Sequence, residues 1–182
     1  VLPDYRRQID KTVALTESLK RHRQELVAAG TRYMNLIETM LKDQQARLDN
    51  TIKNNEPHAE IFRRLEQTRA LNSLLDLGGA VRLSNFQSQV LRDPQIAEKG
   101  MDNFTRMDEI VAFMKGSVRR DAAKEEIRRI EEVMNAYRKG FRVLIDEWKS
   151  IQQLSGERLK NINILLETSQ KTSEYALEQV QQ

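Results

Sequence analysis

The sequence predicts an all-α protein, and three features of the chain lead to this prediction. Of the 182 residues, 31% are charged, only 5% are aromatic, and few are glycine or proline. Apolar residues recur every three or four positions over long stretches. No stretch alternates long enough to predict a strand. We therefore expect an elongated antiparallel helical bundle with mixed-charge surfaces.

The first helix is expected from about residue 3 to about residue 54. Pro3 suits a first helical turn, because proline lacks the N–H that would have no partner there. The run Asn54-Asn55-Glu56-Pro57 ends the helix. Its seam, meaning the line of residues expected to face the core, is Tyr5, Ile9, Thr12, Thr16, Leu19, Leu26, Gly30, Tyr33, Ile37 and Met40.

Two shorter helices are expected next, over about 57–91 and 94–115. Asp93 and Pro94 separate them, because Asp93 can cap the third helix and Pro94 suits its first turn. Gly116 ends the third helix. The seam of the second helix is predicted to be Ile61, Leu65, Thr68, Asn72, Leu75, Gly79, Arg82, Phe86 and Gln89. This register places the charged side chain of Arg82 in a core position.

The fourth helix is expected from about residue 121 to residue 182. Its predicted seam is Ile127, Ile130, Met134, Tyr137, Phe141, Leu144, Trp148, Ile151, Ser155, Arg158, Ile162 and Leu165. Arg158 therefore occupies a position where an apolar residue is expected. A buried charge needs a partner, because desolvating an unpaired ion costs several kcal/mol. The seam offers no acidic partner, which favours an anion from outside the chain.

The helix lengths predict how the bundle is organised. The two long helices are each on the order of 80–90 Å long, and the two short ones about half that. We expect the short helices to lie end to end along the long ones, giving two stacked four-helix modules that share both long helices. The pattern Gly-x-Arg-x-x-Asn recurs at 30–35 and 156–161. This repeat predicts a duplicated unit, each copy of which has two short helices and one long helix. The two short helices of the first copy are expected to precede Val1.

These patterns predict a site for a small carboxylate. Arginine suits this ligand, because its planar fork donates two parallel hydrogen bonds and remains charged. The candidate ligand-binding residues are Arg82, Arg158, Arg32, Asn161 and Ser155, and those of a second site are Tyr5, Arg6, Tyr137 and Arg138. An alternative stays open, in which the arginines pair with carboxylates of the protein or a neighbouring subunit, or extend into solvent.

Several other classes of function are disfavoured. No nucleophile or acid–base pair stands out, so we expect no enzyme and no cofactor. His22 and His58 have no ligand partners at metal spacing, so we expect no metal site. The net charge of +3 is spread along the chain, which argues against nucleic acid as a partner. No run of about 18 apolar residues predicts a membrane span.

Four short motifs resemble a known family. They are Tyr5-Arg6 at the start of the first helix, Val81-Arg82 in the second, Asn135-Ala136-Tyr137-Arg138 in the fourth, and Glu167-Thr168-Ser169-Gln170 near its end. Together with the helix order, they resemble the helical bimodular sensor domain of bacterial methyl-accepting chemotaxis receptors. That family has six helices in two stacked bundles, and this chain is similar to its third to sixth helices.

The resemblance implies a periplasmic sensor of small organic acids that signals across the inner membrane through its last helix. The resemblance also implies a homodimer and an attachment to the inner membrane through flanking helices outside this chain. The membrane-distal module would comprise about 1–29 with 93–150, and the membrane-proximal module about 30–91 with 151–182. Arg82 and Arg158 match carboxylate-contacting positions.

The same resemblance implies that helix one descends towards the membrane, that helices two and three ascend, and that helix four descends. The alternative to a sensor is a structural or scaffolding helical bundle that binds a protein partner.

Overall fold

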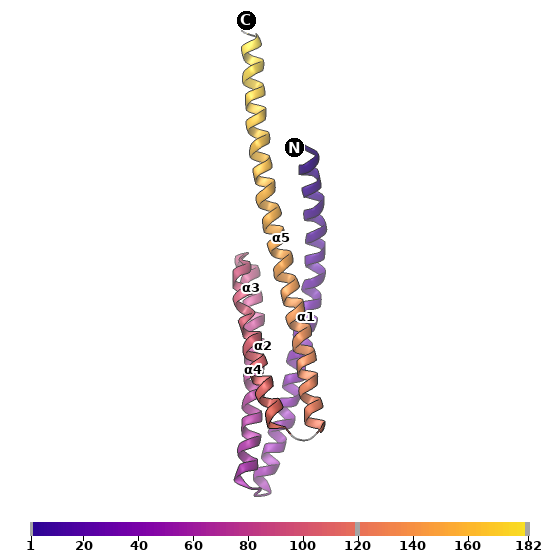
Figure 1. Cartoon of the computed structure of the whole chain (residues 1–182), viewed down its shortest axis with the longest axis vertical. Helices are drawn as coiled ribbons and strands as arrows, with labels where there is room; N and C mark the ends of the chain where they lie inside the picture. Colours follow the sequence, from indigo (N-terminus) through magenta and orange to yellow (C-terminus); the bar gives the residue numbers. More distant parts are fainter. Residues whose placement is uncertain (1, 119–120, 181–182) are drawn as a thin grey trace. The chain divides into compact units, whose positions relative to one another are not determined.

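The computed structural model describes residues 2–118 and 121–180. They form five helices: α1 (Leu2–Lys53), α2 (His58–Leu91), α3 (Pro94–Gly100), α4 (Asp102–Ser117) and α5 (Asp121–Val180) (Figure 1). Within these residues there is no strand, so the all-α prediction is confirmed.

The helix ends follow the predicted signals closely. Asn55 takes a positive φ of 52° in the turn after α1. Arg92 takes a left-handed conformation at the end of α2, and the Asp93 carboxylate accepts a hydrogen bond of 2.9 Å from the Gln95 backbone N–H at the start of α3. The predicted third helix is divided at Met101 into α3 and α4.

The chain forms two compact units. Residues 22–118 and 121–145 form the four-helix unit, in which the consecutive short helices α3 and α4 together take the place of one helix, and residues 2–21 with 146–180 form the helix-pair unit. These units differ from the predicted modules, which grouped 30–91 with 151–182. The difference arises because the short helices do not lie end to end.

In the four-helix unit, α2 packs side by side with α3 and α4 as a helical hairpin (Figure 1). Gly100 of α3 lies so close to α2 that a Cβ atom there would be 2.8 Å from the Ser84 side chain. Further along, Ala80 and Asn103 line one pocket, and Ala70 and Phe113 line another. The end-to-end expectation is therefore wrong. The apolar face of an amphipathic helix can be buried both in an end-to-end arrangement and in a hairpin. The short connection at Arg92–Asp93 favours the hairpin.

The two long helices are antiparallel in both units. In the four-helix unit, Gly30 contacts Tyr137 and Arg47 pairs with Glu126. In the helix-pair unit, Gln8 pairs with Asn161 and Ser18 with Glu147. The expectation that helices one and four both descend is therefore wrong. The turn after α1, the turn between α2 and α3, and the connection between α4 and α5 each reverse the chain. Three reversals leave α5 opposite in direction to α1.

The core of the four-helix unit contains the predicted seams of the first and fourth helices. Leu26, Tyr33 and Ile37 of α1 are buried, and so are Ile127, Ile130, Met134, Tyr137, Phe141 and Leu144 of α5. The Tyr33 hydroxyl donates a buried hydrogen bond of 2.8 Å to the Leu74 carbonyl oxygen. Phe104 of α4 stacks edge to face on Tyr137 at 5.5 Å between ring centroids. Aromatic side chains from three helices therefore fill this core.

The predicted seam of α2 is wrong by one position over most of its length. The buried residues of this helix are Gln67, Thr68, Ala70, Leu71, Leu74, Leu77, Gly78, Val81 and Ser88. Leu71, Leu74, Gly78 and Val81 each immediately precede a residue of the predicted seam. Val81 thus occupies the core position assigned to Arg82, and Arg82 is exposed.

Candidate functional site

Two of the predicted site residues, Arg82 and Tyr137, line the same pocket in the four-helix unit. The volume of this pocket is about 310 Å³. From α1, Gly30 and Thr31 line it beside Leu26 and Val27. A Cβ atom at Gly30 would lie 3.0 Å from the Tyr137 ring, so glycine allows this ring to approach the α1 backbone. Tyr137 thus lines the pocket from α5.

The polar wall of the pocket comes from α2. Arg82, Asn85 and Gln89 line it at helical spacing, together with Phe86. The Gln89 side-chain amide donates a hydrogen bond of 2.9 Å to the Asn85 amide oxygen. We refer to this pocket, defined by Gly30, Arg82, Asn85, Gln89 and Tyr137, as the Arg82 pocket.

The charge of Arg82 is not neutralised within the described chain. No carboxylate of residues 2–118 or 121–180 lies within salt-bridge distance of its guanidinium. Burial raises the pKa of Tyr137, and the nearby positive charge of Arg82 acts in the opposite direction. Tyr137 therefore stays neutral at physiological pH. The pocket combines one positive charge with amide, hydroxyl and aromatic groups, which suits a small anion.

Arg158, Ser155 and Asn161 lie in the helix-pair unit. Arg158 is half-buried, its Nε atom is buried without a hydrogen-bond partner, and its Nη2 donates a bond of 3.2 Å to Ser155 Oγ. Asn161 donates a bond of 2.9 Å to the Gln8 amide oxygen. The side chain of Arg158 is thus partly satisfied by a neutral neighbour on its own helix. Arg82 and Arg158 belong to different units, so each is a candidate by itself.

The other candidates have different surroundings. Arg32 is exposed on α1 and lines none of the pockets described here. Arg138 forms a salt bridge with Asp108 and lies over the Phe104 ring at 5.5 Å, so its charge is compensated inside the protein. Of the predicted second site, Tyr5 and Arg6 lie in the helix-pair unit, whereas Tyr137 and Arg138 lie in the four-helix unit.

The sequence reasoning missed Asn85 as a pocket residue. The signal was available in the spacing, because Asn85, Phe86 and Gln89 follow Arg82 at three, four and seven positions on the same helix face. The predicted seam of α2 places Phe86 and Gln89 in the core, because most of this seam lies one residue after the positions that are buried in the structure.

Compared with known proteins, the chain matches no family model, no curated protein and no solved structure. Among residues 2–118 and 121–180, no helix is both long and apolar enough to cross a membrane. Over the same residues, no group of three histidine, cysteine, aspartate or glutamate side chains could hold a metal ion.

Proposed function

We propose that the chain is a sensor domain that binds a small organic anion in the Arg82 pocket. The observation that carries the proposal is a guanidinium without a carboxylate partner in the described chain, at the wall of a pocket that also presents neutral polar groups. Arginine holds carboxylates through paired, charge-assisted hydrogen bonds. The expected ligand is therefore a small carboxylate.

The wider receptor context rests on the resemblance to bacterial chemotaxis receptors. In that context the chain belongs to a homodimeric periplasmic domain, and membrane helices outside this chain anchor it in the inner membrane. The carboxylate binds one conformation of the bundle more tightly and shifts the population towards it. The helix α5 supports this role, because it contributes to both units as one helix of 60 residues. A small displacement at Tyr137 can thus act on the whole length of α5.

A thermal-shift screen of carboxylates with two to six carbon atoms tests the proposal. A ligand at about 100 times its dissociation constant stabilises the protein by about 2.7 kcal/mol. For carboxylates without an α-amino or α-hydroxyl group, we expect the Arg82→Gln variant to lose this stabilisation and the Arg32→Gln variant to keep it, because Arg32 lies outside the pocket. The proposal fails if no carboxylate stabilises the protein, or if Arg82→Gln responds as the unchanged protein does.

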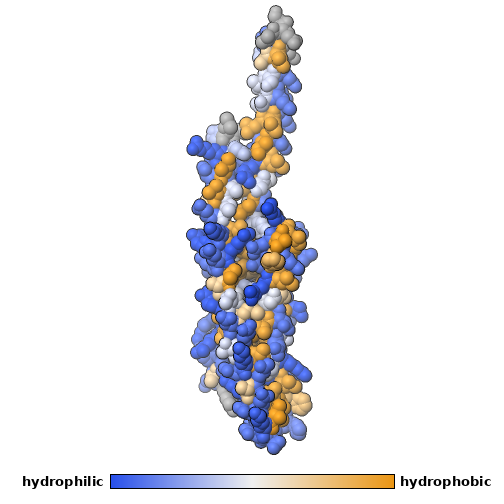
Figure 2. Space-filling model, turned by 180° about the vertical axis from the view of Figure 1, so that it is seen from behind, coloured by the Kyte–Doolittle hydropathy of each residue, from blue (hydrophilic) through white to orange (hydrophobic). Residues whose placement is uncertain are grey.

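A scaffolding bundle that binds a protein partner is the second candidate. Its support is a row of exposed apolar residues on α2, with Leu83 at 56%, Phe86 at 65% and Val90 at 62% exposure. Figure 2 shows that apolar side chains also reach the surface elsewhere, among hydrophilic ones. For a scaffold, replacing Phe86 with Ser would abolish partner binding and Arg82→Gln would leave it unchanged. For a sensor, Arg82→Gln would remove the response to carboxylates.

A further inference from the structure

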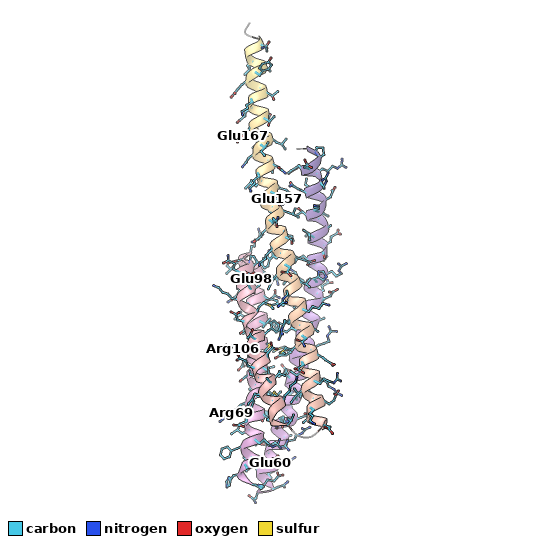
Figure 3. The ribbon with its side chains drawn as sticks, viewed as in Figure 1. Glu60, Arg69, Glu98, Arg106, Glu157 and Glu167 are labelled. Carbon is cyan, nitrogen blue, oxygen red and sulfur yellow. The ribbon has the colours of Figure 1, made fainter. Side chains whose placement is uncertain are left out.

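A second pocket lies at another part of the four-helix unit, where α1 ends and α2 and α5 begin. Its volume is about 200 Å³. Gln44 of α1 and Gln67 of α2 line it, and so do Ala122 and Ala123 in the first turn of α5. Figure 3 marks Glu60 at this end of α2. None of these residues lines the Arg82 pocket.

Two buried amides in this pocket have no partners. Gln44 is 8% exposed and Gln67 is 4% exposed. The side-chain oxygen of each is buried without a hydrogen bond, and within residues 2–118 and 121–180 neither amide nitrogen donates one. A buried polar group without a hydrogen-bond partner destabilises the folded protein, because it loses its hydrogen bonds to water and gains none in return. Both side chains occupy positions where leucine would pack without this cost, so the amides point to a function other than folding.

Three arginines surround the amides and outnumber the carboxylates near them. Arg47 pairs with Glu126 at 3.2 Å. Arg64 donates from Nε to Glu60 at 3.0 Å, and Arg63 pairs with the same carboxylate. Three guanidinium groups therefore share two carboxylates, which leaves one positive charge in excess.

The first turn of α5 adds to this positive character. Its backbone N–H groups have no acceptors within the helix, and the helix dipole makes this end partly positive. Arg64 is well covered, with a side-chain exposure of 13%. Its terminal nitrogens form no hydrogen bond within the described chain and are available to an anion.

We propose that this pocket binds a small carboxylate that carries an amino or hydroxyl group next to the carboxylate, that is, an α-amino or α-hydroxy acid. The carboxylate faces Arg64 and the first turn of α5. A neighbouring α-ammonium group donates to the amide oxygens of both Gln44 and Gln67, whereas an α-hydroxyl group, which has one hydrogen, donates to one of them. A simple anion would satisfy the guanidinium but not these two acceptors.

Calorimetric titrations of the full chain test this assignment, with L-alanine, L-serine, L-glutamine and L-lactate as ligands. Propionate is the matched control, because it keeps the carboxylate of lactate and alanine and lacks the α-donor. All titrations use the Arg82→Gln background, so that the Arg82 pocket does not contribute. A failure here is then distinct from a failure of the proposed sensor function.

We expect at least one α-substituted acid to bind at least tenfold more tightly than propionate. Replacing Gln67 with Leu should remove that preference, and Arg64→Gln should weaken binding of every ligand at least tenfold. If Gln67→Leu does not fold, Gln44→Leu serves the same purpose. The assignment is overturned if none of the four acids binds, if propionate binds equally well, or if the glutamine and Arg64 variants bind as tightly as the background protein.

Discussion

The four-helix unit and the helix-pair unit differ in how completely they bury their apolar seams. In the four-helix unit, α5 buries Ile130 and Phe141 completely, at 0% exposure each. In the helix-pair unit, the seam of the same helix continues through Ile151, Ile162 and Leu165, which are only half-buried. Leu19 and Trp148, each 8% exposed, are the buried apolar residues of this unit within the described chain.

This difference shows what a second pair of helices contributes. An amphipathic helix buries a stripe at least about 100° wide, and one partner helix covers only part of such a stripe. Apolar side chains of the helix-pair unit thus remain exposed: Val13, Leu159, Ile164, Leu166, Tyr175 and Leu177. The apolar repeat continues into the helix-pair unit, with Ser155 and Arg158 as polar exceptions, and its apolar residues are less buried because they have fewer helices beside them.

Truncating a buried aromatic residue should give the largest effect. We expect Phe141→Ala to destabilise the protein by about 3–5 kcal/mol, because it removes a fully buried ring from a closed core. The matched change in the helix-pair unit is Leu159→Ala, at a side chain 61% exposed. It should change stability by less than about 0.5 kcal/mol. Urea denaturation followed by circular dichroism measures both, and equal losses would remove the distinction between the units.

Replacing a glycine with alanine should change the stability less than Phe141→Ala does. The change should be a loss in the four-helix unit and a gain in the helix-pair unit. A Cβ atom at Gly78 would lie 2.5 Å from the Tyr33 ring, which is fully buried and held by its hydrogen bond to Leu74. Overpacking costs about 1–3 kcal/mol, whereas alanine improves helix propensity by only about 1 kcal/mol. Gly78→Ala should therefore destabilise the protein.

The control for this change is Gly156→Ala in the helix-pair unit. A Cβ atom there would meet nothing within 4 Å, so the variant should gain up to about 1 kcal/mol. Thermal denaturation of both variants measures the two signs. If Gly156→Ala destabilises the protein, another group must lie close to Gly156, which would contradict the open space around this position.

Alkaline pH should weaken the four-helix unit through its two buried tyrosines. Burial raises the pKa values of Tyr33 and Tyr137 above the ordinary value of about 10. Above pH 10 the unfolded chain has lost these protons and the folded protein keeps them, so stability falls as pH rises. The slope is at most about 1.4 kcal/mol per pH unit for each tyrosine. Unfolding of Tyr137→Phe between pH 8 and pH 11 should show a shallower decline than the unchanged protein, and an identical decline would refute this origin.

The smallest effect is expected at Glu60, on the surface of the four-helix unit. A hydrogen bond and the positive charge of Arg63, with a further contribution from Arg64, lower the pKa of Glu60. The stabilisation is present above the ordinary carboxyl pKa and is lost as pH falls through the lowered value. Glu60→Gln should cost less than about 1 kcal/mol at pH 7, because solvent screens exposed pairs. The difference from the unchanged protein should shrink as pH falls below the ordinary carboxyl pKa, and a difference that does not change with pH would point to packing rather than charge.

The sequence predicted most of the fold, and the residues show why. Asp93-Pro94 and Asn54-Asn55 marked the helix ends, since capping and positive-φ residues act locally. The seam of α5 was correct because every buried position in the four-helix unit carries a large apolar residue. The seam of α2 was misplaced, because Gln67, Gly78 and Ser88 fill buried positions that hydropathy does not mark.

The candidate site was predicted only in part. Arg82 was a candidate of the first predicted site, Tyr137 was a candidate of the second, and Gly30 was predicted only as part of the first-helix seam. All three line one pocket in the structure. Their grouping could not be predicted, because it depends on which helices are neighbours. The hairpin of α2 with α3 and α4 sets those neighbours. Arg82 and Arg158, which the sequence analysis assigned to one site, belong to different units, so the grouping of these two residues stays a prediction.

Hydrogen–deuterium exchange with and without a stabilising carboxylate tests the central claim most directly. It reports local opening along the whole chain, so it locates the site without any substitution. If the carboxylate binds in the Arg82 pocket, backbone amides around Gly30, Arg82–Gln89 and Tyr137 should exchange more slowly. Slower exchange confined to 151–162, around Arg158, or no change anywhere, would contradict it.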